Sequence, residues 1–217
     1  MKKKLLLLDL DGTIADTIRS IRDAVNLTLA KYGYPEKSYE QIRVAIGNGA
    51  RNLIRRTLPP EVAADEENVT RVLGEYDVLY EQTYDHVDGC YEGMSEALHT
   101  LHDKGYLIAV LSNKQDAYVK KIVGMLFPDG IIAYVQGQTD LPIKPDPTVP
   151  LMIARTLGVA PEDAVFIGDS DVDIETGKNA GMLSVGCAWG YRGRAVLEEA
   201  GADHVLEHPS ELLALFD

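Results

Sequence analysis

Two aspartates separated by one residue lie near the start of the chain, in the segment Asp9-Leu10-Asp11-Gly12-Thr13. The four leucines Leu5 to Leu8 precede them, and such a short apolar run is typical of a strand buried on both faces. Side chains at positions i and i+2 of an extended chain point to the same side, so we expect both carboxylates in one crevice. The two carboxylates would repel each other, so we expect them to share a cation or one of them to keep its proton. A plain acidic turn is the alternative.

Polar residues also follow two later apolar segments. Ser112-Asn113 come directly after the segment 106–111, and Gly168-Asp169-Ser170 come after the segment 164–167. Ligands of parallel sheets bind at the carboxyl ends of the strands. We therefore expect these groups to meet the first two aspartates at one edge of a sheet.

A lysine and two further aspartates complete this set. Lys144 lies in the connection before a predicted helix, and Asp171 and Asp173 lie just beyond Asp169. Each has an ordinary alternative: Lys144 as a solvated loop residue, and the two aspartates as complements to a helix N-terminus. Ser112 likewise has the alternative of a helix N-cap. That all of them lie next to predicted strand ends favours a shared site.

The elements that must position these groups alternate between strand and helix. The predicted strands cover 5–8, 106–111, 131–135, 164–167 and 183–188, with a last strand near His204 before a C-terminal helix. The predicted helices between them cover 95–104, 116–126, 147–157 and 173–180. This alternation predicts an α/β fold with a doubly wound parallel sheet, a Rossmann-like core.

The segment 15–85 interrupts the alternation with helical patterns only. Apolar residues follow helical spacing after Thr13, a second helix opens near Arg51, and a third covers about 66–82. We therefore predict an all-helical cap domain over 15–85, inserted into an α/β catalytic core formed by 1–14 and 86–217.

The chemistry that suits these residues is phosphoryl transfer. Several carboxylates without a nearby histidine or cysteine make a hard oxygen site that suits Mg²⁺. A serine hydroxyl, backbone amides and a lysine ammonium are the donors that phosphoryl oxygens require. One carboxylate can form an aspartyl-phosphate while a second carboxyl group acts first as general acid and then as base.

In these motifs the sequence resembles the haloacid dehalogenase-like superfamily, in its phosphatase branch with a helical cap after the first strand. The segment from Asp9 to Thr13 matches the first motif of that superfamily, and Ser112-Asn113 match the second. Lys144-Pro145 match the third motif, and the segment from Gly168 to Asp173 matches the fourth. The four motifs occur in order, and the resemblance covers essentially the whole chain.

The resemblance implies a role for each of these residues. Asp9 would attack phosphorus and bind Mg²⁺, while Asp11 would protonate the leaving alcohol, activate water and touch the metal through its backbone carbonyl. Asp169 would be the remaining direct metal ligand, with Ser170 and Asp173 in support, Asp173 bound through water or holding neighbouring groups. The catalytic residues would be Asp9, Asp11, Ser112 and Lys144, and the phosphate-binding residues Leu10, Gly12, Thr13, Ser112, Asn113 and Lys144.

Substrate recognition is expected from the cap. The segment Gly47-Asn48-Gly49-Ala50-Arg51 offers backbone amides at a helix N-terminus, which can bind an anion. Arg51 adds a fixed charge suited to a carboxylate. This segment and Trp189-Gly190-Tyr191 resemble phosphoglycolate phosphatases, so 2-phosphoglycolate is the predicted substrate and Asn48, Gly49 and Arg51 its predicted cap contacts. A helix-connecting turn with a surface arginine is the alternative.

Composition limits the partners. The formal charge of −13 disfavours nucleic acid and anionic membranes, and leaves a small phosphorylated molecule as the expected partner. The first apolar run breaks at Asp9, too early for a signal peptide or a membrane span, so we expect a cytoplasmic protein. Cys90 and Cys187 have no metal-type spacing. We expect a monomer or a homodimer.

Other functions use a similar set of residues. A phosphomutase resembling β-phosphoglucomutase shares the core residues but returns the phosphoryl group to its substrate, and pyrophosphatase or nucleotidase activity suits the same fold. A non-enzymatic alternative is a receiver-like signalling module, which also places an aspartate, a hydroxyl and a lysine at strand ends. The length of 217 residues, the helical insertion and the Asp-x-Asp spacing disfavour the receiver.

Overall fold

The computed structural model describes residues 4–216, and their contacts divide the chain into two compact units. The α/β unit comprises Met1–Asp16 and Gly89–Asp217, and the helical unit comprises Thr17–Asp88. Among residues 4–216, none of the helices combines the length and the hydrophobicity that a membrane span requires.

The α/β unit contains one sheet of six parallel strands in the order β3-β2-β1-β4-β5-β6. The strands are β1 Leu5–Leu8, β2 Leu107–Gln115, β3 Tyr134–Gln138, β4 Ala164–Gly168, β5 Leu183–Cys187 and β6 His204–Leu206. The predicted fold class is confirmed. The strand order reverses between β1 and β4, so the carboxyl ends of these two strands form the crevice where such sheets bind ligands.

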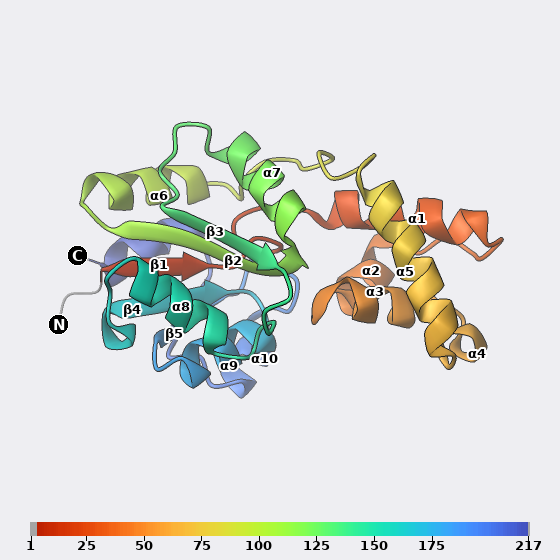
Figure 1. Ribbon diagram of the computed structural model, residues 1–217. Coiled ribbons are helices and arrows are strands. Elements are labelled where there is room, and N and C mark those ends of the chain that lie inside the picture. Colours follow the sequence, from red (N-terminus) through yellow and green to blue (C-terminus); the bar gives the residue numbers. More distant parts are fainter. Residues whose placement is uncertain (1–3, 217) are drawn as a thin grey trace. The chain divides into compact units, whose positions relative to one another are not determined.

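Helices cover both faces of the sheet (Figure 1). They are α6 Met94–Asp103, α7 Asp116–Leu126, α8 Thr148–Thr156, α9 Asp171–Asn179 and α10 Arg194–Glu199, with 3-10 turns η1 Pro161–Asp163 and η2 Pro209–Leu215. Leu7 and Phe166 are paired across β1 and β4, and they pack with Ile153 of α8 in one buried cluster. α6 and α7 lie on the opposite face. β1 is fully buried between these layers, as its leucine run predicts.

Four predicted elements of this unit differ from the structure. The strand predicted over 106–111 continues as β2 to Gln115, because Gln115 pairs again with Gln138 of β3, so Ser112 and Asn113 lie within the strand rather than after it. The third strand covers 134–138 rather than 131–135, because its pairing with β2 begins only at Tyr134, opposite Ala109. The last helix is a 3-10 segment, η2. The short helix α10 was not predicted, because only Leu197 of its six residues is buried and no apolar periodicity marks it.

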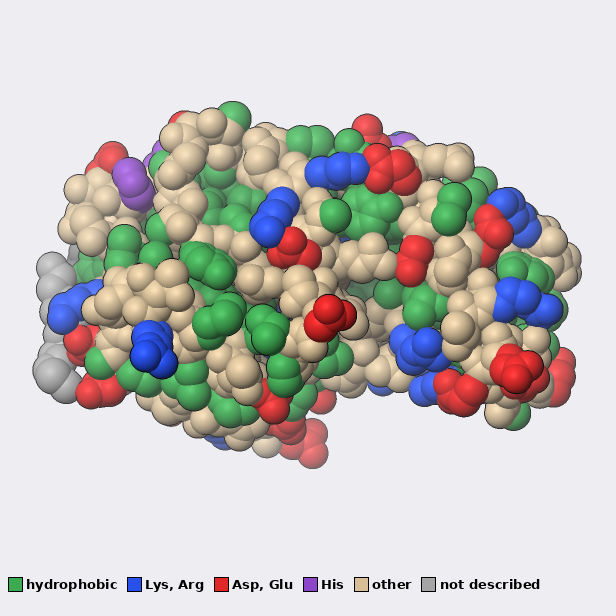
Figure 2. Space-filling view, viewed as in Figure 1, with side chains coloured by type: hydrophobic (Ala, Val, Ile, Leu, Met, Phe, Trp, Pro, Cys, Tyr) green, Lys and Arg blue, Asp and Glu red, His purple; other side chains and the backbone are tan. Residues whose placement is uncertain are grey.

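The helical unit contains five helices among its residues 17–88, all of which the structure describes. They are α1 Ile18–Lys31, α2 Tyr39–Ala45, α3 Gly49–Thr57, α4 Pro60–Ala63 and α5 Glu66–Tyr80. Ser20 of α1 and Tyr80 of α5 are buried and their hydroxyls lie 3.0 Å apart. On the face drawn in Figure 2, acidic and basic side chains lie interspersed over this unit.

Candidate active site

Three buried aspartates converge at the carboxyl ends of β1 and β4. Asp9 follows β1, Asp169 follows β4, and Asp173 lies in the first turn of α9. Each offers a carboxylate oxygen, and the three oxygens lie within 4.8 Å of one another. The side chains come together because β1 and β4 are hydrogen-bonded neighbours.

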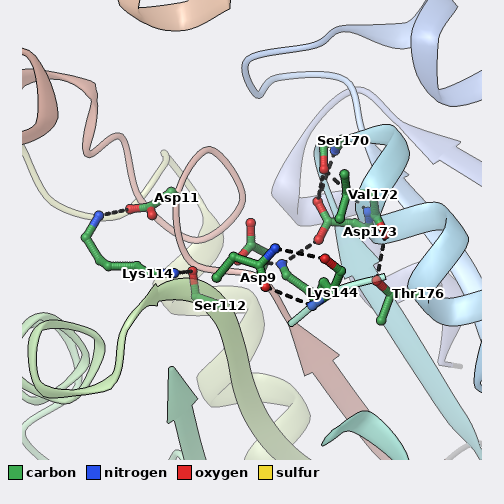
Figure 3. Close-up of polar contacts among 10 residues, drawn as sticks. Asp9, Asp11, Ser112, Lys114, Lys144, Ser170, Val172, Asp173 and Thr176 are labelled. Carbon is green, nitrogen blue, oxygen red and sulfur yellow. Dashed lines mark hydrogen bonds and ion pairs between the residues drawn. The ribbon is translucent and has the colours of Figure 1, made fainter. Parts of the chain in front are cut away.

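Lys144 is the cation that faces this cluster. Its Nζ lies 2.9 Å from Asp9 Oδ1 and 2.6 Å from Asp173 Oδ1. Figure 3 shows Lys144 between these two side chains. Burial lowers the pKa of Lys144, but the carboxylates of Asp173 and Asp9 outweigh burial and hold the pKa above its ordinary value. The ammonium therefore stays charged, and the predicted lysine is placed beside the predicted nucleophile.

One lysine does not balance the three carboxylates. Burial raises the pKa of Asp9 to about 6 even though Lys144 opposes this rise. Burial also raises the pKa of Asp169, with the carboxylates of Asp173 and Asp9 adding to the effect. An excess of buried negative charge on hard oxygen ligands fits a divalent cation.

Ser170 and Asp173 form a reciprocal cap at the start of α9. The Ser170 N–H and hydroxyl donate to Asp173 Oδ2 at 3.1 and 2.6 Å, and the Asp173 N–H donates to Ser170 Oγ at 3.4 Å. Asp173 Oδ2 is thereby engaged, and Oδ1 accepts from Lys144. This arrangement agrees with a supporting role for both residues.

The loop after β5 holds Asp169 from the other side. The Tyr191 N–H donates to Asp169 Oδ2 at 2.6 Å, and the Tyr191 hydroxyl lies 3.1 Å from Asp16 Oδ1. A Cβ on Gly190 would collide with Asp169 and with the Gly12 carbonyl. This loop stood out in the sequence, but its contact with a candidate metal ligand was not predicted.

Asp11 has a different partner from Asp9. Its Oδ1 accepts from Lys114 Nζ at 2.7 Å, and its carboxylate is not part of the cluster of three. Figure 3 shows the Asp11–Lys114 pair apart from the contacts around Lys144. Lys114 is not among the residues predicted for the site, although it directly follows Ser112-Asn113. The metal contact through the Asp11 carbonyl stays a prediction.

The two residues of the second motif have contacts within the α/β unit. Ser112 is buried, and its Oγ accepts from the Lys114 N–H at 3.4 Å. Asn113 Oδ1 accepts from the Lys144 N–H at 2.9 Å, while Asn113 Nδ2 donates to the Lys144 carbonyl at 3.1 Å. Asn113 therefore holds the backbone that carries the lysine, and its contact with phosphate stays a prediction.

In the loop that follows Asp9, backbone N–H groups donate hydrogen bonds to carbonyl groups of the same loop. The Gly12 N–H donates to the Ala15 carbonyl at 3.0 Å, and the Thr13 N–H donates to the Leu10 carbonyl at 3.3 Å. Thr13 Oγ1 is buried and has no hydrogen-bond partner in the described part of the chain. Phosphate binding by Leu10, Gly12 and Thr13 remains a prediction.

The three predicted cap residues lie at the start of α3. Asn48 has a left-handed backbone, with φ of 60°, and Gly49 begins the helix. Arg51 is exposed and contacts α5, with Nη1 3.3 Å from Glu66 Oε2 and 3.2 Å from Thr70 Oγ1. Their contact with substrate stays a prediction.

The family model described as haloacid dehalogenase-like hydrolase matches residues 6–187, which include all four motifs. The chain belongs to this family. Its similarity to named relatives extends over nearly the full length. It is 34% identical to the phosphoglycolate phosphatase of Aquifex aeolicus, over 99% of this chain and 97% of the relative. It is 31% identical to that of Haemophilus influenzae, over 98% and 97%.

Solved structures of haloacid dehalogenase-like hydrolases have the same fold. The crystal structure of a predicted phosphoglycolate phosphatase from Haemophilus somnus has a TM-score of 0.91 and 25% sequence identity to this chain. The match covers 100% of this chain and 99% of the other. The family resemblance seen in the motifs, and the hydrolase class that it implies, are confirmed.

Proposed function

We propose that this protein is a Mg²⁺-dependent phosphomonoester hydrolase that works through an aspartyl-phosphate on Asp9, with 2-phosphoglycolate as its substrate. The observation that carries the proposal is the buried cluster of Asp9, Asp169 and Asp173 with Lys144 against it. The named relatives support the choice of substrate. The cytoplasmic location expected from the sequence, and a monomer or homodimer, belong to the same proposal.

In the first half of the reaction, a carboxylate oxygen of Asp9 attacks phosphorus. The bond from this oxygen to phosphorus forms as the ester bond from phosphorus to the leaving oxygen breaks. The carboxyl group of Asp11 gives its proton to that leaving oxygen, and the alcohol departs. Lys144 offsets the charge that develops on the phosphoryl oxygens, and Ser112 donates a hydrogen bond to one of them.

In the second half, water attacks the phosphorus of the aspartyl-phosphate. The Asp11 carboxylate takes a proton from this water, so Asp11 returns to the form with which it began. The bond between Asp9 and phosphorus breaks, inorganic phosphate leaves, and the Asp9 carboxylate is restored.

Asp9, Asp169 and the backbone carbonyl of Asp11 would hold the Mg²⁺. Asp173 is engaged by Lys144 and Ser170, so it would support the site through water or through these neighbours. When bound, the ion supplies positive charge against the carboxylates and the phosphoryl oxygens.

The helical insertion, predicted over 15–85, acts in this proposal as the cap that selects the substrate. Phosphoglycolate carries a carboxylate beside its phosphate, and Arg51 is an exposed cation on α3. Asn48 and Gly49 add backbone amides at the same helix start. The carboxylate would replace Glu66 as the partner of the arginine.

A hydrolysis panel with Mg²⁺ tests the proposal. The substrates are 2-phosphoglycolate, ethyl phosphate, sugar phosphates, nucleotides and pyrophosphate, and released phosphate is measured. We expect the highest kcat/KM for phosphoglycolate, and we expect Arg51→Ala to raise KM for phosphoglycolate but not for ethyl phosphate. Faster hydrolysis of nucleotides or pyrophosphate would contradict the substrate assignment, and phosphoryl transfer to a sugar without phosphate release would indicate a mutase.

A further inference from the structure

A second buried lysine lies beside the candidate active site, at the end of β2. Lys114 Nζ is 2.7 Å from Asp11 Oδ1, and the two side chains are only 9% and 13% exposed. A lysine is rarely buried unless a partner compensates for the loss of water. Asp11 is that partner, and Lys114 is not among the residues to which the proposed mechanism gives a role.

The end of β2, where Lys114 lies, is irregular. The pairing of β2 with β3 shifts between Leu111 and Gln115. Within this stretch the Lys114 N–H bonds to Ser112 Oγ, and the Asn113 side chain bonds to the Lys144 backbone. Consecutive residues of β2 therefore fix two lysines, and each lysine faces one of the two aspartates of the first motif.

We propose that Lys114 is a positioning residue that holds the Asp11 carboxyl group where it can exchange a proton with the leaving oxygen. The proposal rests on the proposed function, which makes Asp11 the general acid. A general acid must lie within hydrogen-bond reach of the atom that it protonates. Asp11 lies directly before the turn 12–14. Its side chain has rotatable bonds that the hydrogen bond from Lys114 to Oδ1 restricts, and this oxygen can accept that bond in both the acid and the carboxylate form.

If Lys114 acts through Asp11, its replacement should slow only those substrates whose leaving group needs a proton. A purely structural role would not distinguish between leaving groups. Phenolate is a poor leaving group and needs a proton, whereas p-nitrophenolate spreads its charge and leaves without one. The two aryl phosphates share the phenyl ring and the charge of the phosphate, and they differ in the para nitro group. The value of kcat/KM reports on the steps up to the first irreversible one, which is the transfer of the phosphoryl group to Asp9.

The experiment compares the wild type with Lys114→Met on phenyl phosphate and p-nitrophenyl phosphate, both with Mg²⁺. We expect kcat/KM to fall about 100-fold for phenyl phosphate and less than about threefold for p-nitrophenyl phosphate. Lys120→Met is the matched control, because Lys120 pairs with Asp116 at 2.6 Å on the exposed surface of α7. It should leave both values unchanged.

A double-variant comparison places the effect on Asp11. In an Asp11→Asn background, Lys114→Met should lower kcat/KM for phenyl phosphate by no more than about twofold further. If Lys114→Met does not fold, Lys114→Arg serves instead, because its charge lies at a different distance and should also impair phenyl phosphate selectively.

Equal losses on the two aryl phosphates, no loss on either, or a full additional loss in the Asp11→Asn background would overturn the role of Lys114. A wild-type protein that releases no phosphate from 2-phosphoglycolate or from either aryl phosphate would instead overturn the proposed function, so the two failures are distinct.

Discussion

Asn113 and Lys144 are joined by two hydrogen bonds, in which the carboxamide of Asn113 grips the backbone N–H and carbonyl of Lys144 at 2.9 and 3.1 Å. The side chain of Lys144 then reaches Asp9 and Asp173. The ammonium therefore takes its position from a residue on β2, far away in the sequence. This link joins the second and third motifs into one structure.

Replacement of Asn113 should act through Lys144. We expect Asn113→Ala to lower kcat/KM about 10- to 100-fold, because the loop that carries the ammonium loses both hydrogen bonds. In a Lys144→Ala background the same replacement should cost little more, which steady-state kinetics of the four proteins would measure. If Asn113→Ala lowers kcat/KM by the same factor with and without Lys144, then Asn113 acts independently of Lys144, for example by direct contact with phosphate.

If Mg²⁺ binds the buried carboxylates as proposed, it should stabilise the folded protein. At a free concentration of about 100 times Kd, the free energy of unfolding should rise by about 2.7 kcal/mol. Urea unfolding with and without Mg²⁺ measures this gain. Asp169→Asn should abolish most of it, whereas Asp171→Asn, at an exposed position in the first turn of α9, should retain it. Equal gains in both variants would refute the placement of the metal.

Gly12 and Gly105 offer a matched pair of substitutions. Their φ angles are +83° and +86°, so alanine strains both, at about 1–2 kcal/mol each. Only at Gly12 would the new Cβ meet neighbours, namely the Asp169 carboxylate and, at 2.8 Å, Tyr191 Cδ2. In Gly12→Ala, Mg²⁺ should therefore no longer raise the free energy of unfolding, and kcat/KM should fall about 100-fold. In Gly105→Ala only the free energy of unfolding should fall. Similar kinetics for the two would contradict this packing.

His99 should titrate above the ordinary value of 6.5. Its pKa is raised first by the hydrogen bond to the Ser95 carbonyl and then by the carboxylate of Asp129, 2.6 Å from Nε2. A raised pKa means that the pair stabilises the fold below pH 6.5 and that this contribution disappears as pH rises through the folded-state value. NMR titration should show a lower His99 pKa in Asp129→Asn; an unchanged value would exclude the ion pair in solution.

The carboxylate cluster could be predicted from the sequence because strand ends are predictable. The leucine run before Asp9 and the apolar run before Asp169 mark two strands, and the alternation of strands with helices makes the sheet parallel. Parallel strands place their carboxyl ends at one edge, so the convergence of these side chains follows from topology alone.

The partner of Asp11 could not be predicted in the same way. Lys114 lies where the pairing of β2 with β3 shifts between Leu111 and Gln115, and no local pattern in the sequence encodes that shift. The contact of Tyr191 with Asp169 depends likewise on how one loop packs over another. The start of β3 was misplaced by three residues because apolar residues before Tyr134 continue the pattern without continuing the ladder.

Asp9 is the proposed nucleophile, and its replacement by asparagine removes the group that attacks phosphorus. Phosphate release from 2-phosphoglycolate is followed with Mg²⁺ for the wild type and for Asp9→Asn, after both are shown to be folded. We expect Mg²⁺-dependent turnover by the wild type and a loss of at least about 1,000-fold in the variant, since an amide cannot form the aspartyl-phosphate. Turnover by Asp9→Asn at the wild-type rate would contradict the assignment of Asp9 as the nucleophile.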